Sequence, residues 1–360
     1  MLPPSPIIVI MQGAAAWNHW RLTQTTTPQL REALLIRANL PKINLHQVDS
    51  CISNFSGANL FQADLSQAIF YTANLSQARL DSAILEAVDM REANLREASL
   101  VRVQAEHTNF AMADLHGGNL REAILNDSNF CKASLQNVDG SMAQMNSCSF
   151  NDANLKGSVF YTANLQQANL RRANLSAADF REANLTQAIL EDVCGCNASF
   201  DRAILDRALL TGAVLTGANL TMATLKLTIL NQADLSKALI KNAILTGASL
   251  VSTRLEGAQL QNSQFDQADC RNARLSEANL ENVSFQGADL SGADLSKAYL
   301  HGACLTGANL KRTNLSHVDL SQTQLTNTDL SQAILSGTQL PGGYAQISSK
   351  QTAAYHGRVA

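Results

Sequence analysis

The chain has 360 residues, of which 46% are hydrophobic and only 16% are charged. Its formal net charge is −3, with both signs interspersed. It therefore provides neither the basic surface typical of nucleic-acid binding nor a polyacidic surface. The length would suit two ordinary domains, but no linker interrupts the repeat that fills most of the chain, which predicts a single repeat domain.

The first eleven residues, 1–11, are expected to form an unstructured leader. The apolar stretch Pro6–Met11 lacks a basic flank and is far too short to span a bilayer or to act as a secretory signal. The sequence therefore predicts a cytoplasmic protein without membrane insertion. It leaves open whether Met1 or Met11 is the true start.

Residues 12–29 are predicted to form a short helical N-terminal cap. Within them, Ala14–Leu22 is expected to form a helix that lays Trp17 and Trp20 over the start of the repeat. Such a cover is needed because exposed β edges pair with other chains. The alternative that the tryptophan pair is a docking site stays open.

The repeat region, 30–340, is defined by a large apolar residue at every fifth position from Leu30 to Leu340. Leu fills 45 of these 63 central positions and Phe fills ten, and a small residue, usually Ala, stands two positions earlier. On an α-helix this spacing would rotate the leucines by about 140° per step. On a flat strand it would alternate them between faces. The leucines share one interior only if the chain turns a corner in every five-residue unit, as in a β-solenoid.

The central phenylalanines indicate how many corners close one coil. Eight of the ten fall in runs with a spacing of 20, such as Phe110, Phe130 and Phe150. Charged residues 20 apart form eleven opposite-sign pairs and only three like-sign pairs, as expected for neighbours in adjacent coils. The pattern predicts a four-sided coil of four units and about 15 coils over 30–340.

Five central positions hold a small or polar residue, and for four of them a valine two positions earlier replaces the missing volume. These exceptions are Ser50, Ala105, Gly140, Gly195 and Cys270, and the valines are Val48, Val103, Val138 and Val193. We expect the valines to limit any cavity. The alternative is that Gly140 and Gly195 open a pocket.

Many units read Ala-Asn/Asp-Leu, among them Ala58-Asn59-Leu60, Ala168-Asn169-Leu170 and Ala293-Asp294-Leu295. This pattern resembles the pentapeptide-repeat family over most of the chain, from Leu30 to Leu340. The resemblance implies an all-β fold, a right-handed quadrilateral β-helix. The opening Ala16–Arg21 also resembles that of many cyanobacterial members.

Seven cysteines occur and none stands 20 positions from another, so no disulfide framework is expected, which fits a reducing compartment. Cys148 and Cys270 should point inward as small apolar side chains. Cys194 and Cys196 flank Gly195 and should point outward. A structural role is favoured for this pair over a metal or redox role, because two thiols are too few ligands for a metal site.

The sequence shows no catalytic, cofactor-binding or metal-binding residues, and we expect a protein that is not an enzyme. Gly287 to Gly292 has the glycine spacing of a phosphate loop, but Ala293 stands where Lys is needed. All five histidines of the repeat occupy outward positions, and His301 is expected to stack with a carboxylate, Glu281. The prediction is a scaffold or regulatory binding protein that presents flat faces to an unknown protein partner.

The alternative function is that of a DNA-mimicking inhibitor or protector of type II topoisomerase (gyrase), as the resemblance allows. That activity relies on a strongly acidic surface and a dimer built through a C-terminal helix, which this sequence lacks. Residues 341–360, beginning at Pro341, are expected to be a flexible tail. With no helix to cover the last coil, a homodimer through a coil end is possible.

Overall fold

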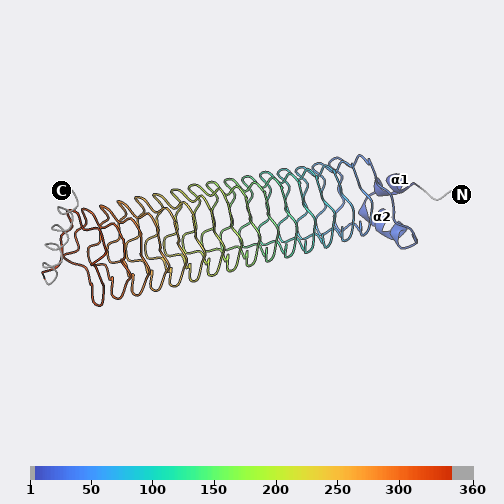
Figure 1. Ribbon diagram of the computed structural model, residues 1–360. Coiled ribbons are helices and arrows are strands. Elements are labelled where there is room, and N and C mark those ends of the chain that lie inside the picture. Colours follow the sequence, from blue (N-terminus) through green and yellow to red (C-terminus); the bar gives the residue numbers. More distant parts are fainter. Residues whose placement is uncertain (1–4, 343–360) are drawn as a thin grey trace. The chain divides into compact units, whose positions relative to one another are not determined.

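The computed structural model describes residues 5–342, which fall into two compact units, 5–189 and 190–342. Two helices, α1 (Pro6–Ile10) and α2 (Ala14–Arg21), precede the repeat. Within each unit the chain winds in stacked coils, and the two helices lie beside the first coils of the N-terminal unit (Figure 1). The predicted tail lies, beyond Gly342, outside the described residues.

Each five-residue unit consists of a short extended segment and a tight turn. In the first unit, the N–H of Ala33 donates to the carbonyl of Leu30 at 3.0 Å and closes a four-residue turn. Glu32, the third residue of this turn, has a φ of 58°, and the equivalent position has a positive φ in unit after unit. This is the conformation that a type II turn requires. The chain therefore changes direction once in every unit, as the odd period of the leucines predicts.

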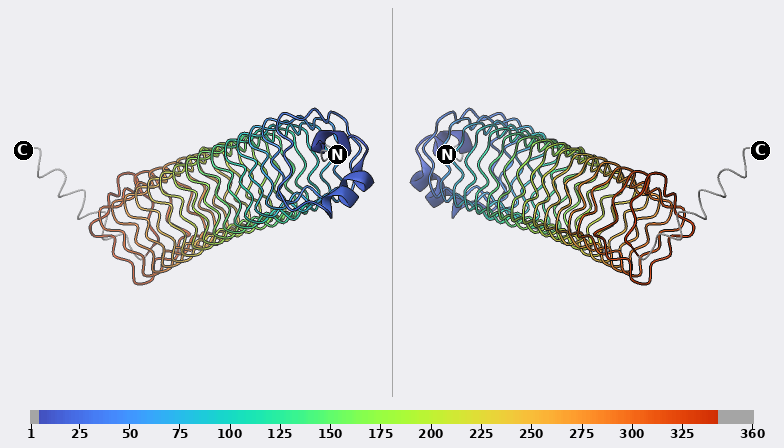
Figure 2. Two further views of the ribbon diagram at one scale, coloured as in Figure 1. Left: turned by 90° about the vertical axis from the view of Figure 1, so that its right-hand side faces the viewer. Right: turned by 90° about the vertical axis from the view of Figure 1, so that its left-hand side faces the viewer.

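Parallel β-bridges join residues 20 positions apart in both units, for example Asn54 to Asn74 and Ser199 to Asn219. Only one residue per side forms a bridge, because turns follow one another too closely for longer strands. Figure 2 shows successive coils of each unit lying parallel to one another. Four five-residue units therefore complete one coil, which confirms the predicted four-sided winding.

The interior of the coils contains the residues that the period predicts. The central leucines and the small residues two positions earlier are almost all less than 3% exposed. Phenylalanines 20 positions apart stack, with ring centroids 4.8 Å apart for Phe110 and Phe130 and 5.0 Å apart for Phe130 and Phe150. Phe160 and Phe180 stack at 5.4 Å. Dispersion and burial of these rings stabilise the coil register.

The glycine at central position 140 does not open a pocket. A Cβ built on Gly140 would lie 2.5 Å from Cε1 of Phe160, which belongs to the next coil. Val138, two positions before the glycine, is fully buried. The large ring of one coil therefore occupies the space left by the small residue of the coil below it, and this complements the valine compensation expected from the sequence.

Ion pairs between residues 20 apart form at several of the predicted places. The nitrogen–oxygen distances are 2.7 Å for Arg102–Glu122, 2.7 Å for Arg172–Asp152, 2.5 Å for Arg254–Asp234 and 3.8 Å for Lys297–Glu277. Arg274 instead lies 4.0 Å from Glu256. These exposed pairs each contribute about 0–1 kcal/mol, so they support the register more than the stability.

The expectation of an unstructured leader over 1–11 is wrong for the residues that form α1. Pro6 starts this helix at a position where its missing N–H costs nothing. Val9 is 6% exposed and Ile10 is 1% exposed, and α1 packs against α2. The leader is ordered because two of its apolar side chains find a buried environment that local sequence patterns do not reveal.

Helix α2 caps the first coil, as the sequence predicts for Ala14–Leu22. Trp17 is fully buried, and its indole N–H donates to the carbonyl of Asn44 at 2.5 Å. The side chain of Asn18 accepts a hydrogen bond from the N–H of Asn44 at 2.8 Å and donates to the carbonyl of Lys42 at 2.9 Å. Asn18 therefore supplies the hydrogen bonds that a preceding coil would make. Because Trp17 is part of this cap, it is not available as a docking residue.

Candidate interaction surfaces

Two exposed clusters with the same four residue types lie on the N-terminal unit. They comprise Tyr71, Asp89, Arg91 and Glu92 in the first Tyr–Arg cluster, and Tyr161, Asp179, Arg181 and Glu182 in the second. In each cluster the tyrosine is the second residue of a turn, and the other three residues come from the next coil.

In the first Tyr–Arg cluster, Arg91 is held in place by two neighbours. Its Nε and Nη2 atoms donate to the two carboxylate oxygens of Asp89 at 2.8 and 2.7 Å. Its Cζ atom lies 5.5 Å from the ring centroid of Tyr71. The Tyr71 hydroxyl donates to Glu92 at 3.2 Å. The guanidinium and the ring therefore form a fixed, exposed plane, since a two-point ion pair restricts the arginine.

The second Tyr–Arg cluster repeats this geometry. Arg181 donates to Asp179 at 2.9 and 2.7 Å, and its Cζ atom lies 5.7 Å from the ring centroid of Tyr161. The Tyr161 hydroxyl donates to Glu182 at 3.3 Å. The two tyrosines are similarly exposed, at 36% for Tyr71 and 38% for Tyr161.

The clusters arise from a duplication that our reading of the sequence missed. The segments 70–75 and 160–165 are both Phe-Tyr-Thr-Ala-Asn-Leu, and 91–95 and 181–185 are both Arg-Glu-Ala-Asn-Leu. The offset of 90 positions equals four and a half coils, so the clusters lie on opposite corners of the N-terminal unit, about 22 Å apart along its axis. Identity at this offset is the signal that would have found them.

In both clusters the arginine lowers the pKa of the neighbouring aspartate. The hydrogen bonds from Arg91 hold the pKa of Asp89 below its usual value. Burial acts against the ionised form of Asp179, but the hydrogen bonds from Arg181 outweigh it, so the pKa of that carboxyl is also lowered. The charge and hydrogen bond of Glu92 raise the pKa of the Tyr71 hydroxyl. Counted by formal charge, each cluster has one positive and two negative side chains, which gives a net charge of −1.

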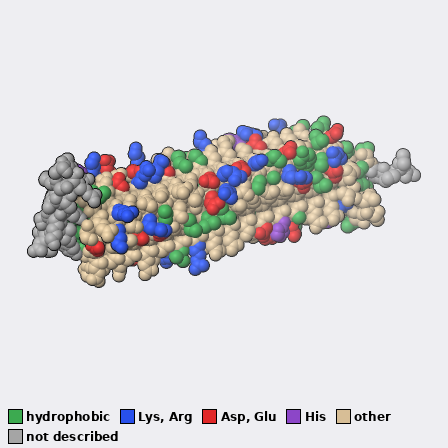
Figure 3. Space-filling model, viewed as in Figure 1, with side chains coloured by type: hydrophobic (Ala, Val, Ile, Leu, Met, Phe, Trp, Pro, Cys, Tyr) green, Lys and Arg blue, Asp and Glu red, His purple; other side chains and the backbone are tan. Residues whose placement is uncertain are grey.

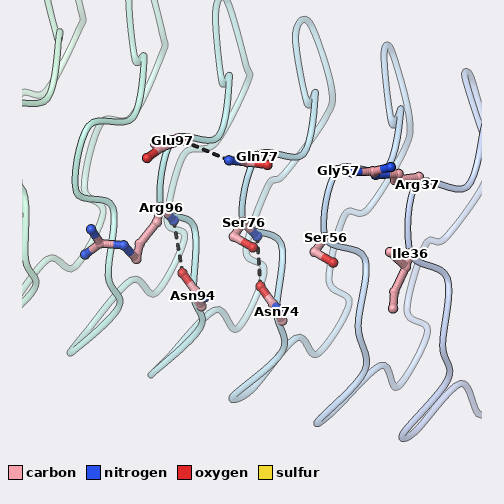
Figure 4. Close-up of a pocket in the computed structure, with 10 residues that line it drawn as sticks. All are labelled: Ile36, Arg37, Ser56, Gly57, Asn74, Ser76, Gln77, Asn94, Arg96 and Glu97. Carbon is pink, nitrogen blue, oxygen red and sulfur yellow. Dashed lines mark hydrogen bonds between the residues drawn. The ribbon is translucent and has the colours of Figure 1, made fainter.

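A shallow groove of about 530 Å³ runs along one corner of the N-terminal unit (Figure 4). It exists because Ser56, Gly57 and Ser76 leave room between larger neighbours such as Arg37. On its floor Gln77 donates to Glu97 at 3.0 Å. The groove combines mixed charge with small polar side chains, and neither histidine nor cysteine lines it.

A second shallow groove, of about 490 Å³, lies on the C-terminal unit and includes Gly287. The glycine spacing seen from Gly287 to Gly292 therefore belongs to two successive turns, where both glycines have a positive φ, and not to a loop around a phosphate. The groove is lined by Thr, Gln, Gly and one carboxylate, Asp266, which accepts hydrogen bonds from Ser284 and from the N–H of Gln286.

The expected stack of His301 on Glu281 is replaced by a contact with a different residue. The ring of His301 stacks on Tyr299 with centroids 6.1 Å apart. Over residues 5–342, neither an ion pair nor a hydrogen bond joins His301 to Glu281. His46 shares a hydrogen bond of 2.8 Å with Ser66, which lies in the neighbouring coil.

The cysteines lie where their positions in the repeat predict. Cys148 and Cys270 are buried, and burial raises the pKa of the Cys148 thiol to about 12. Cys194 is exposed and Cys196 is half-buried. Within residues 5–342 no disulfide joins any two of the cysteines, and no group of three potential metal ligands occurs there.

Lys and Arg side chains (blue) and Asp and Glu side chains (red) are interspersed on the face that Figure 3 shows, and some of them are adjacent. The ion pairs between residues 20 apart likewise bring opposite charges together. No helix within residues 5–342 is long and apolar enough to cross a bilayer.

The family model described as pentapeptide repeats matches the chain in eight copies. The matches form two unbroken runs, over 53–194 and 197–342. No curated protein sequence matches the chain.

Three solved structures illustrate the similarity. HetL, a pentapeptide-repeat protein involved in heterocyst differentiation regulation from Nostoc sp. strain PCC 7120, is 29% identical, with 68% of this chain and 90% of HetL covered and a TM-score of 0.25. Trypsin-treated QnrB1, a plasmid-mediated fluoroquinolone resistance protein, is 17% identical over 64% of this chain and 95% of its own, with a TM-score of 0.36. Rfr23 from the cyanobacterium Cyanothece 51142 is 33% identical over 30% of this chain and 63% of its own, with a TM-score of 0.21. From the family matches and the four-sided coil, we conclude that the chain belongs to the pentapeptide-repeat family, whose fold is a right-handed quadrilateral β-helix.

Proposed function

We propose that this protein is a non-enzymatic scaffold that binds two equivalent segments of a protein partner through its two Tyr–Arg clusters. The observation that carries this proposal is the repetition of the same exposed geometry at two sites offset by 90 positions. Coil packing does not require the repetition, because tyrosine, arginine and glutamate here all lie outside the core.

The chemistry of the clusters suits protein recognition. Tyrosine and arginine are enriched among residues that dominate binding energy, since they offer large contact area with a polar end. Both clusters stand on a rigid backbone, so little conformational entropy is lost when a partner binds. A net charge of −1 at each cluster favours a partner segment that presents a Lys or Arg side chain beside an apolar residue.

The proposal also includes the cellular location and the number of coils expected from the sequence. We place the protein in the cytoplasm, because an odd number of cysteines with no two of them 20 positions apart suits a reducing compartment. We also take 30–340 as about 15 coils of four units each. The DNA-mimic alternative needs a continuous negative face, whereas the faces described here alternate in sign.

The test is affinity purification from the native host with the full chain as bait, followed by mass spectrometry and chemical cross-linking. Tyr71→Ser with Arg91→Ser removes the first cluster, Tyr161→Ser with Arg181→Ser removes the second, and a fourth bait combines all changes. We expect each single-cluster variant to retain less of the partner and the combined variant to retain none.

The matched control is Arg271→Ser in the C-terminal unit. Arg271 forms the same two hydrogen bonds to Asp269, at 2.8 and 2.7 Å, but Val251 stands where the clusters have tyrosine. This variant should retain the partner fully. Equal retention by all baits would refute the role of the clusters, and potent inhibition of gyrase supercoiling by the unaltered chain would favour the DNA-mimic function instead.

A further inference from the structure

One unit of the repeat carries cysteine at both outward positions that flank a central residue. Cys194 precedes the central Gly195 and Cys196 follows it. In every other unit between residues 30 and 340, at most one of these two positions is a cysteine. Both thiols reach the surface, because Cys194 is exposed and Cys196 is half-buried.

Elsewhere in the repeat, side chains at these two outward positions touch one another. The Ser66 hydroxyl donates to Asp64 at 2.5 Å, and the Ser141 hydroxyl donates to Asp139 at 2.6 Å. The most direct comparison is Cys304, whose Sγ atom lies 3.4 Å from Oγ1 of Thr306. Cys304 and Thr306 occupy the same register as Cys194 and Cys196, so the fold brings the γ atoms of this register into contact.

The two thiols of Cys194 and Cys196 are in contact in the same way. The Cys196 thiol shares a hydrogen bond with Cys194. Burial and the adjacent Cys194 raise the pKa of the Cys196 thiol. Cys194 is the more exposed of the two thiols and is therefore the one that an incoming disulfide reaches first.

The backbone between the thiols has room to adapt. A disulfide needs its sulfur atoms about 2.05 Å apart and its Cβ atoms about 3.8 Å apart, so the thiols must approach further. The intervening residue is Gly195, which has no side chain to keep in the core, while its N–H is anchored to the carbonyl of Val214 at 2.8 Å. A leucine, as at Leu305, would resist this adjustment because it is buried.

We propose that Cys194 and Cys196 are a dithiol–disulfide couple that exchanges reversibly with low-molecular-weight disulfides of the glutathione type. The Cys194 thiolate attacks one sulfur of the small disulfide, and the departing thiolate takes up a proton. The Cys196 thiolate then attacks the Cys194 sulfur of the mixed disulfide, and the second small thiol leaves in the same way. The dithiol is oxidised by two electrons, and the small disulfide is reduced to two thiols.

Such a bond closes a very small ring, and strained disulfides are easily reduced. The couple is therefore a reversible modification site and not a structural cross-link. The other cysteines are unsuited to this chemistry. Cys148 and Cys270 are buried, and burial suppresses the ionisation of both thiols, whereas the 3.0 Å contact of Cys131 is with the hydroxyl of Ser149 and not with a second thiol.

The test equilibrates the full-length protein with mixtures of reduced and oxidised glutathione, traps the remaining thiols by alkylation, and identifies the 194–196 peptide by mass spectrometry. We expect that peptide to lose two hydrogens as the oxidised form increases and to regain them on reduction. Cys196→Ser should prevent this loss and instead retain one glutathione at Cys194. Cys194→Ser should abolish both products.

Two controls separate this site from general thiol oxidation. Cys131→Ser should leave the 194–196 couple unchanged. Thr306→Cys creates the same arrangement around Leu305, and it should need a more oxidising mixture because the central leucine restrains the backbone. The proposal is overturned if the 194–196 peptide keeps both thiols in excess oxidised glutathione, or if Thr306→Cys forms its disulfide more readily than Cys194 and Cys196 do.

Discussion

The ring of Phe160 lies so close to Gly140 that a Cβ at position 140 would be 2.5 Å from Cε1 and 2.7 Å from Cδ1 of the ring. The two residues are 20 positions apart and occupy the same side of neighbouring coils. The pair shows that volume inside the solenoid is shared between coils as well as within one five-residue unit.

Gly140→Ala should therefore destabilise the protein, although alanine is common in the core. The added methyl group forces the Phe160 ring or the backbone to move, and such overpacking costs about 1–3 kcal/mol. Denaturant unfolding measures the free energy. Phe160→Leu together with Gly140→Ala should recover part of the loss, and simple additivity of the two changes would contradict the proposed contact.

Asn18→Ala should loosen the first coil. The substitution leaves the N–H of Asn44 and the carbonyl of Lys42 without their hydrogen bonds to Asn18, which we expect to cost about 1–2 kcal/mol locally. Hydrogen exchange of the Asn44 amide should quicken accordingly, while amides deep in the N-terminal unit keep their protection, because solenoids open from their ends. The control is Leu22→Ala, because Leu22 is 84% exposed. This variant should change neither the local stability of the first coil nor the exchange rate of the Asn44 amide.

Ile52→Gly should stabilise the protein. Ile52 has a φ of 61° and is 54% exposed, so a β-branched residue occupies a left-handed turn position without gaining much burial. Left-handed backbone costs an ordinary residue about 1–2 kcal/mol, and glycine avoids this cost. We expect a gain of about 1 kcal/mol in the free energy of unfolding. Gly57→Ala, at the next corner with a φ of 64°, should have the opposite effect, and a loss of stability in Ile52→Gly would contradict the argument.

Arg91→Gln should change how stability depends on pH. The pKa of Asp89 is lowered in the folded state, chiefly by its hydrogen bonds from Arg91, so this pair stabilises the fold above the unfolded pKa of about 3.9 and the benefit is lost as the pH falls through the folded pKa. The unfolding temperature of the variant should lie below that of the unaltered protein at pH 7. The difference should vanish under strongly acidic conditions.

The control for this prediction is Arg37→Gln, because Arg37 forms no ion pair with any residue in the range 5–342. Its pH profile should run parallel to that of the unaltered protein. A constant difference between Arg91→Gln and the unaltered protein at all pH values would mean that packing of Arg91 on Tyr71, and not its ion pair, is responsible.

The sequence predicted which residues are neighbours in adjacent coils and which side chains point inward, because the repeat imposes a single spacing. Leu30 and each later central residue must share one interior, and an odd period allows this only with a corner in every unit. The phenylalanine stacks and several ion pairs, such as Arg102 with Glu122, follow from the same register.

The candidate surfaces could be predicted only in part. The outward positions of Cys194 and Cys196 follow from the period, but the contact between side chains on either side of a central residue is a property of the turn geometry. The pairing of Asp89 with Arg91, two positions apart, was missed for the same reason. The two Tyr–Arg clusters could have been found from the identity of 70–75 with 160–165.

What the sequence by itself determined is the winding of the chain, since hydrophobic burial at every fifth position requires a corner in each unit and the spacing of the phenylalanines sets four corners to a coil. Tertiary structure decided the features that depend on contacts between segments distant in the chain. Burial of Ile10 stabilises α1, where the local pattern predicts no structure. Asn18 accepts the hydrogen bond from Asn44 that a preceding coil would otherwise accept. The Phe160 ring fills the space beside Gly140. The physical reason is that a period specifies direction and spacing, whereas the shape of each side chain and its neighbours in the next coil decide which contacts are made.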